Sequence, residues 1–263
     1  MRVLQACMMY VVAAWAMICD MTDGAAGAGS DSDGADAWRA RLGWAFGLIA
    51  DNATEREVAL AHLHGARGNA RAALDRWNEL WLLTRPLGPE EQYQEPAFKR
   101  AYEVYADMCS RTLPEALWVS EDAYGPRSPY ALLFLEWEAR FPREWTECAK
   151  AWGTKQSLIR HMAAAEHDQP TRAKLIDLVA IVVQRAYRCK DREYVRVARA
   201  VDGEDLRHRL GTAAASDNPW ARLHAGYVLW LLDHPEIPNT RRTWRTWVAG
   251  TSGRRHGSSA PYG

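Results

Sequence analysis

Residues 217–233 read DNPWARLHAGYVLWLLD, and residues 168–183 read DQPTRAKLIDLVAIVV. Each stretch begins with aspartate, has proline at its third position, and continues with apolar residues at helical spacing. An aspartate at such a turn caps the helix that follows, and proline suits the first helical turn because its missing amide has no partner there. The two starts are 49 residues apart, and a shorter helical pattern precedes each, over residues 155–166 and 204–212. This spacing predicts stacked helical hairpins.

Apolar spacing is helical nearly everywhere after residue 36. Thr54 followed by Glu57 has the pattern of a capping box, in which the two side chains bind each other's backbone amides. Asn69 precedes another helical pattern, which stops before Pro86. Three further prolines stand where a first helical turn is expected: Pro96, Pro129 and Pro142. No stretch predicts a strand, so we expect an all-α protein.

The stretch from Asp217 to Ala225 is similar to the second helix of a HEAT-type repeat, with a turn aspartate, Arg222 and apolar spacing. The resemblance covers about two repeats well and the remainder loosely. It implies a HEAT-like α-solenoid of stacked helix pairs. An irregular helical bundle is the alternative that the same apolar spacing allows.

Residues 216–222 also resemble a short motif of bacterial HEAT-like alkylpurine DNA glycosylases, Ser-Asp-Asn-x-Trp-x-x-Arg, in which the arginine serves the DNA site. In this chain Arg222 falls one position early. The Trp-Trp-Asp stretch that supplies the catalytic aspartate of that family has no match, and only Lys190-Asp191 stands upstream. The resemblance implies a nucleic-acid-binding protein or a glycosylase-type enzyme as an alternative function.

Length and charge suggest one domain with two unlike halves. At 263 residues the chain could form one large domain or two small ones. We expect a single helical domain over 36–249, between an N-terminal apolar segment and disordered leader at 1–35 and a disordered basic tail at 250–263. Residues 1–150 hold 15 basic and 22 acidic side chains, whereas residues 151–263 hold 18 and 11. Net charges of −7 and +7 favour an acidic partner for the C-terminal half, or head-to-tail self-association.

The N-terminal segment has three interpretations. Residues 3–19 contain no charged side chain. They suit a secretory signal with a cleavage pattern near Ala26 and Ala28, or a short membrane anchor. The third interpretation is that translation starts at Met21, which opens a polar leader. We expect a cytoplasmic protein, with secretion or membrane anchoring through residues 3–19 as the alternative.

The cysteines predict neither a disulfide framework nor a zinc site. Beyond the N-terminal segment the chain has Cys109, Cys148 and Cys189, which are odd in number and far apart. We expect buried single thiols in a reducing compartment. No metal and no cofactor is predicted.

A basic stripe is the first candidate binding surface. Residues 184–200 hold six basic and two acidic side chains, for a net charge of +4. The last three of its members step by four and three residues, so a helix would place them on one face. Such a surface suits a phosphate backbone; the alternative is a solvated helix face on which Asp191 and Glu193 pair locally. The stripe consists of Arg188, Lys190, Arg192, Arg196 and Arg199.

The C-terminal segment is a second candidate, because basic and aromatic residues alternate there and no acid follows residue 236. Rings that stack on bases beside cations suit single-stranded nucleic acid. The alternative is an amphipathic last helix that packs Trp244 and Trp247 inward. The basic residues are Arg241, Arg242, Arg245, Arg254 and Arg255.

The histidines point to no catalytic centre. His62 and His64 are two residues apart on a helix and so face different ways. His208 follows Glu204 and Asp205 at helical spacing, which suits an exposed pair or a water-activating base. The chain has no His-Glu-x-x-His and no phosphate-cradling glycine loop, which disfavours metal-dependent helical enzymes and P-loop enzymes.

Together these patterns predict a non-enzymatic helical-repeat scaffold that binds an acidic partner, a protein or a nucleic acid, through its basic C-terminal half. No catalytic and no metal-binding residue is assigned, and the oligomeric state stays open. The candidate binding residues are Arg188, Lys190, Arg192, Arg196, Arg199, Trp220, Arg222 and His224.

Overall fold

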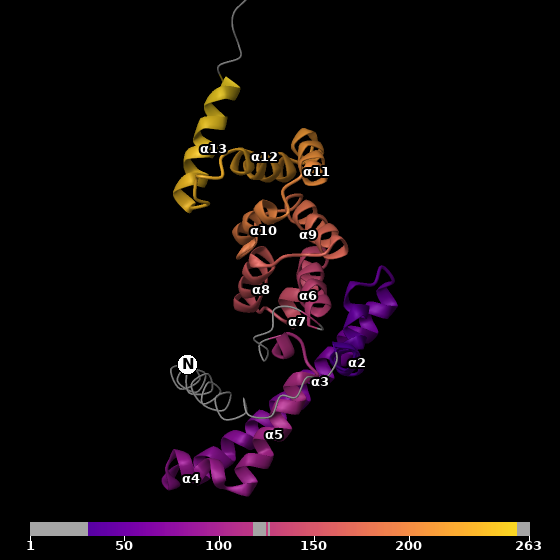
Figure 1. Ribbon diagram of the computed structural model, residues 1–263, viewed down its shortest axis with the longest axis vertical. Coiled ribbons are helices and arrows are strands. Elements are labelled where there is room, and N and C mark those ends of the chain that lie inside the picture. The colour runs from indigo at the N-terminus through magenta and orange to yellow at the C-terminus, as the bar shows by residue number, and fades with distance from the viewer. Residues whose placement is uncertain (1–30, 118–124, 126, 257–263) are drawn as a thin grey trace, which may run out of the picture.

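A computed structural model describes residues 31–117, 125 and 127–256, and every regular element within these ranges is a helix (Figure 1). The prediction of an all-α protein is therefore confirmed. The apolar stretch 3–19 lies outside the described residues, as does the end of the predicted tail. Among the helices that are described, none is long and apolar enough to cross a membrane.

The N-terminal half contains α2 (Asp31–Leu42), the 3₁₀ helix η1 (Gly43–Ile49), α3 (Ala53–Thr84), η2 (Arg85–Leu87), α4 (Pro89–Gln94), α5 (Pro96–Ser110) and η3 (Glu115–Leu117). The remainder contains α6 (Ser128–Arg140), α7 (Pro142–Cys148), α8 (Trp152–Ala164), α9 (Gln169–Val182), η4 (Asp191–Glu193), α10 (Tyr194–Ala200), α11 (Glu204–Ala215), α12 (Pro219–Asp233) and α13 (Arg241–His256). The helical region thus extends beyond the predicted domain limits of 36 and 249 at both ends.

Helices α3 and α5 form an arm that projects from the body, with α4 at its far end (Figure 1). Trp77 holds the arm together, because its ring lies 5.8 Å from that of Phe98 and stacks on Tyr105 at 5.6 Å. At the base of the arm, Arg67 donates to the carbonyl of Cys148 and pairs with Glu115 at 3.6 Å. The arm has its own small aromatic core, and it joins the body through these polar contacts and through Ala59 and Leu63 of α3, which are buried in the core of the body.

Two predicted boundaries in this region are wrong. Helix α3 continues through Asn69, so the two helices expected there are one helix of 32 residues. Its cap is Asn52, whose side chain accepts a hydrogen bond from the amide of Thr54 at 2.9 Å. Thr54 therefore lies inside the helix and does not form the predicted capping box.

The body consists of helices in two rows, seen in the upper part of Figure 1. In one row α9 contacts α6 and α11, and in the other α10 contacts α8 and α12. Successive helices α9 and α10, and then α11 and α12, also contact each other across the rows. One buried apolar core runs through both rows, and α13 packs on α12 at the end.

The contacts between helices show that the predicted repeat has the wrong register. The two stretches that begin at residues 168 and 217 were expected to be equivalent, but they form α9 and α12, which lie in different rows. The local pattern of aspartate and proline therefore marks a helix start, and it does not mark the same position within successive helix pairs.

The starts of these two helices differ in their caps. Asp168 accepts a hydrogen bond from the amide of Thr171 at 2.9 Å, which confirms the predicted aspartate cap and lowers the pKa of Asp168. At α12 the cap is Asn218, which accepts from the amide of Trp220 at 3.0 Å, and Asp217 precedes it. Asn218 also donates to the carbonyl of Gln184 at 2.6 Å, and so ties the start of α12 to the turn that follows α9.

We expect Asn218→Ala to lower the free energy of unfolding by about 1–2 kcal/mol, since it removes both a helix cap and a contact between helix pairs. Asp217→Ala is the matched control, because the neighbouring carboxylate is exposed and makes neither contact. Urea unfolding measures both variants. Equal losses from the two substitutions would contradict the assignment of the cap.

Candidate functional site

The turn between α9 and α10, residues 184–193, is held by Asp191. The carboxylate of Asp191 accepts from the amide of Arg188 at 2.8 Å, and the amide of Asp191 donates to the carbonyl of Arg188 at 3.0 Å. Lys190 takes a left-handed conformation with φ of 69° between them. Cys189 is exposed at this turn, contrary to the expectation of buried thiols, whereas Cys109 and Cys148 are buried.

A buried ion cluster lies beneath this turn. Lys155 and Glu138 are fully buried, and the Lys155 ammonium lies 2.9 Å from Glu138 and 2.5 Å from Asp191. Arg185 pairs with both carboxylates at 3.0 Å, and Arg188 pairs with Glu138 at 3.2 Å. The cluster contains three cations and two carboxylates, from α6, α8 and the turn. Buried charges are tolerated only when they are paired in this way.

Aromatic rings enclose the cluster. Lys155 lies 5.6 Å from the ring centroids of both Trp152 and Tyr194, and the Arg188 guanidinium lies 5.3 Å from that of Trp152. Burial raises the pKa of Tyr194 well above its usual value, so the phenol stays neutral. Asp191 is engaged by Lys155, Arg185 and a backbone amide. We interpret the cluster as the support that holds the turn in place.

Glu193 forms a second polar centre, between α8 and α10. It is buried and accepts hydrogen bonds at 3.0 Å from Gln156, Arg160 and Arg196. Burial raises the pKa of this carboxyl, but the donors, above all Arg160, outweigh burial and lower it to about 2. Arg196 is therefore an exposed cation whose charge is already paired.

The bonds to Glu193 predict a loss of stability in acid. A carboxyl whose pKa is lowered by folding stabilises the protein above its unfolded pKa of about 4.5, and that contribution disappears as the pH falls towards about 2. We expect Glu193→Gln to cost on the order of 2 kcal/mol at pH 7 and less at pH 3. Denaturant unfolding at both pH values tests this, with exposed Glu166→Gln as the control. A constant difference between Glu193→Gln and wild type would contradict it.

Two members of the predicted basic stripe point inward and make ion pairs or hydrogen bonds within the protein. Arg188 belongs to the buried ion cluster, and Arg199 donates to the carbonyls of Leu231, His234 and Ile237 at the end of α12. The expected common helix face is also wrong, because Arg192 lies in η4, before α10 begins. The stripe fails as one surface since unpaired carbonyls and buried carboxylates attract the guanidinium groups inward.

Other cations on neighbouring elements are exposed and make no ion pair with a described residue. Asn239 brings their elements together, since it donates to the carbonyl of Arg192 at 2.8 Å and accepts from Tyr227 of α12 at 3.0 Å. Lys190 is half-buried and likewise has no ion-pair partner among the described side chains. The side chains of Arg254 and Arg255 lie outside the described part. The exposed, unpaired cations are Arg192, Arg222, Arg241, Arg242 and Arg245.

A row of aromatic rings joins α12 and α13, the two helices that carry four of these five cations. Trp220, which is 47% exposed, stacks against His224 at 5.8 Å, and His224 lies 6.0 Å from Trp244 of α13. Trp244 in turn stacks on Trp247 at 5.8 Å, so the predicted inward packing of these two rings is present. Burial lowers the pKa of His224, which keeps the row neutral near pH 7.

Tyr187 adds a second exposed ring. It is 59% exposed, and its hydroxyl lies close enough to Arg192 to interact with the backbone there. We use the name basic edge for the two exposed rings and the five unpaired cations together. The basic edge consists of Tyr187, Arg192, Trp220, Arg222, Arg241, Arg242 and Arg245.

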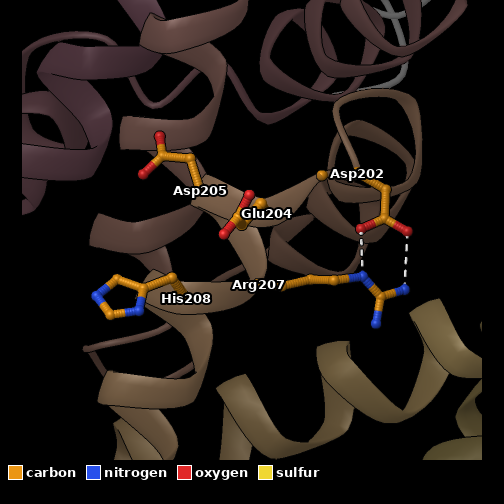
Figure 2. Close-up of a pocket in the computed structure, with 6 residues that line it drawn as sticks. Asp202, Glu204, Asp205, Arg207 and His208 are labelled. Atoms are coloured by element: carbon orange, nitrogen blue, oxygen red, sulfur yellow. Dashed lines mark hydrogen bonds and ion pairs between the residues drawn. The ribbon is translucent and has the colours of Figure 1, made fainter.

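An open depression lies elsewhere, at the start of α11 (Figure 2). Arg207 crosses it, with two bonds to Asp202 at 2.8 and 2.9 Å and one to Asp233 at 2.7 Å. The predicted pairing of His208 with Asp205 is replaced by a bond between Asp205 and Arg209 at 2.9 Å. Figure 2 shows the His208 ring directed away from the Asp202–Arg207 pair. These contacts join helix ends, and the depression is not the candidate site.

Sequence reasoning missed the two fully buried charges of the ion cluster, Glu138 and Lys155. Glu138 follows Phe134 and Leu135 by four and three residues, and Lys155 precedes Leu158 and Ile159 by the same steps, so each charge lies on a buried apolar stripe. A charged residue on such a stripe requires a buried partner, so this pattern in the sequence predicts a buried ion pair. Within the described part of the chain, no three His, Cys, Asp or Glu side chains form a group suited to a metal ion.

The comparisons with known proteins return no relative. No protein-family model matches the chain, and neither a curated protein nor a solved structure does so.

Proposed function

We propose that this protein is a non-enzymatic binding scaffold, a HEAT-like array of stacked helical hairpins that binds an acidic partner through the basic edge. The two rows of α6–α9–α11 and α8–α10–α12 support the array, since each helix contacts its neighbours along one row and its partner across the rows. The basic edge lies in the C-terminal half of the chain, which carries its positive charge, on the turn between α9 and α10 and on helices α12 and α13.

The observation that carries the proposal is the set of five exposed arginines without a described ion-pair partner. Most other arginines in the C-terminal half are neutralised, as in the pairs Arg160–Glu193, Arg207–Asp202 and Arg209–Asp177. An arginine that is paired gains little from a further anion, whereas an unpaired guanidinium offers its donors freely to a carboxylate or phosphate.

The buried ion cluster supports the same interpretation. It fixes the turn that presents Tyr187 and Arg192, and its carboxylates are already engaged by cations. A glycosylase-type reaction would need a carboxylate beside the bound base. Asp191, the acid nearest to that place in the motif, instead holds the turn. We therefore propose binding and not base excision.

Charge reversal at the basic edge tests the proposal. We expect Arg192→Glu, Arg222→Glu and Arg241→Glu combined to weaken binding to an immobilised polyanion, heparin, at least about tenfold. The matched control is Lys99→Glu, Arg100→Glu and Arg143→Glu, which makes the same change in net charge at exposed and unpaired cations of the N-terminal half. Equal weakening in both triple variants would refute a localised site, and wild-type protein that fails to bind at low salt would refute the function itself.

A further inference from the structure

The basic edge combines two kinds of side chain that an acidic protein and a nucleic acid would use differently. Its arginines can form ion pairs with any polyanion. Its exposed rings, Trp220 and Tyr187, leave large apolar surface in water, which is a cost for a surface that only attracts carboxylates. A ligand with alternating anionic groups and flat apolar rings matches both kinds of side chain.

We infer that the basic edge binds single-stranded nucleic acid, with one base stacked on Trp220 and phosphates held by the neighbouring arginines. This inference depends on the proposed function and specifies the class of its partner. Base stacking on aromatic side chains tolerates any sequence, because every base has a flat face. The arginines of the basic edge then pair with the phosphates of the nucleic-acid backbone.

The geometry of Trp220 suits this role. Stacking against His224 supports one side of the indole, while nearly half of the residue is exposed. His224 is itself held between Trp220 and Trp244. A ring supported in this way keeps its orientation without a ligand, so little conformational entropy is lost on binding.

The cations and the exposed rings lie on three elements that two hydrogen bonds join. The hydrogen bond from Asn218 to Gln184 joins the start of α12, with Trp220 and Arg222, to the turn that carries Tyr187. The bond from Asn239 to Arg192 joins the start of α13 to the same turn. A flexible single strand can follow such an edge, whereas a stiff duplex presents its bases inside and cannot reach the rings without distortion.

Fluorescence anisotropy with labelled ligands separates the alternatives. The ligands are a single-stranded oligothymidylate, a mixed-sequence DNA duplex of the same length, and a polyglutamate peptide. We expect the full chain to bind the single strand at least about tenfold more tightly than either other ligand. Equal affinity for polyglutamate or duplex refutes this inference and leaves the proposed function standing. Absence of binding to all three at low salt refutes both.

Variants at Trp220 provide the decisive comparison. We expect Trp220→Ala to weaken binding of the single strand about 5- to 100-fold and to leave duplex and polyglutamate binding within about twofold. Trp220→Phe retains a flat ring and should keep most of the affinity. Because the residue is exposed, unfolding temperatures should match those of wild type, which shows that the fold is retained. Unchanged single-strand binding by Trp220→Ala overturns the inference.

Discussion

Lys155→Met is expected to lower the free energy of unfolding by about 3–5 kcal/mol, because it leaves two buried carboxylates without their shared ammonium partner. Methionine matches the length of the lysine stem, so the main change is the loss of charge and not the loss of packing. Chemical denaturation at neutral pH measures the effect, provided that far-ultraviolet circular dichroism shows retained helicity.

Two comparisons isolate the cause of that loss. Lys174→Met removes a pair between exposed Lys174 and Glu136 at 3.3 Å, and Arg140 still pairs with Glu136, so the substitution should cost no more than about 1 kcal/mol. Lys155→Met combined with Glu138→Gln should cost less than the sum of the two single effects, because both substitutions break the same ion pair. If the double variant is instead less stable by the sum of the single effects, the cluster is not a coupled unit.

Raising salt from about 50 to about 200 mM should weaken binding of single-stranded DNA about 50-fold, if four of the basic-edge arginines contact phosphates. Each contact releases a counterion, and for a single strand the logarithm of affinity then falls by about 0.7 per contact for each tenfold rise in salt. Titrations at several salt concentrations give the slope directly.

The slope also assigns contacts to residues. Arg222→Ala should reduce the size of this slope by about 0.7. Arg100→Ala, a substitution of an exposed cation outside the basic edge, should leave the slope unchanged. Trp220→Ala should weaken binding with little change in slope, since stacking releases no ions. An affinity that hardly responds to salt would show that phosphates are not what the arginines bind.

The sequence was sufficient to predict the helical class and many helix starts. Pro96, Pro129 and Pro142 each fall in the first turn of a described helix, because proline is tolerated only there within a helix. The break expected near Asn69 was wrong, since packing of α3 against α5 overrides local preference along α3. The register of helix pairs also depends on contacts between rows, which a local motif does not encode.

The candidate site was predictable in composition but not in arrangement. The exposed cation Arg222 and the exposed ring of Trp220 are among the predicted residues. Arg188 and Arg199 were placed on the same surface, but they turn inward to a carboxylate and to backbone carbonyls. Spacing along a helix predicts which side chains share a face. It does not predict which of them will form hydrogen bonds with the end of a neighbouring helix.

The uninterrupted helix α3 has a mechanical consequence. One end of this single rod of 32 residues belongs to the body, where it contacts η1, and the other end belongs to the arm. Because α3 is continuous, we expect a force applied at α4 to be transmitted along its axis to the contacts with η1 and those around Arg67. The arm therefore behaves as a stiff lever whose direction is set by the body.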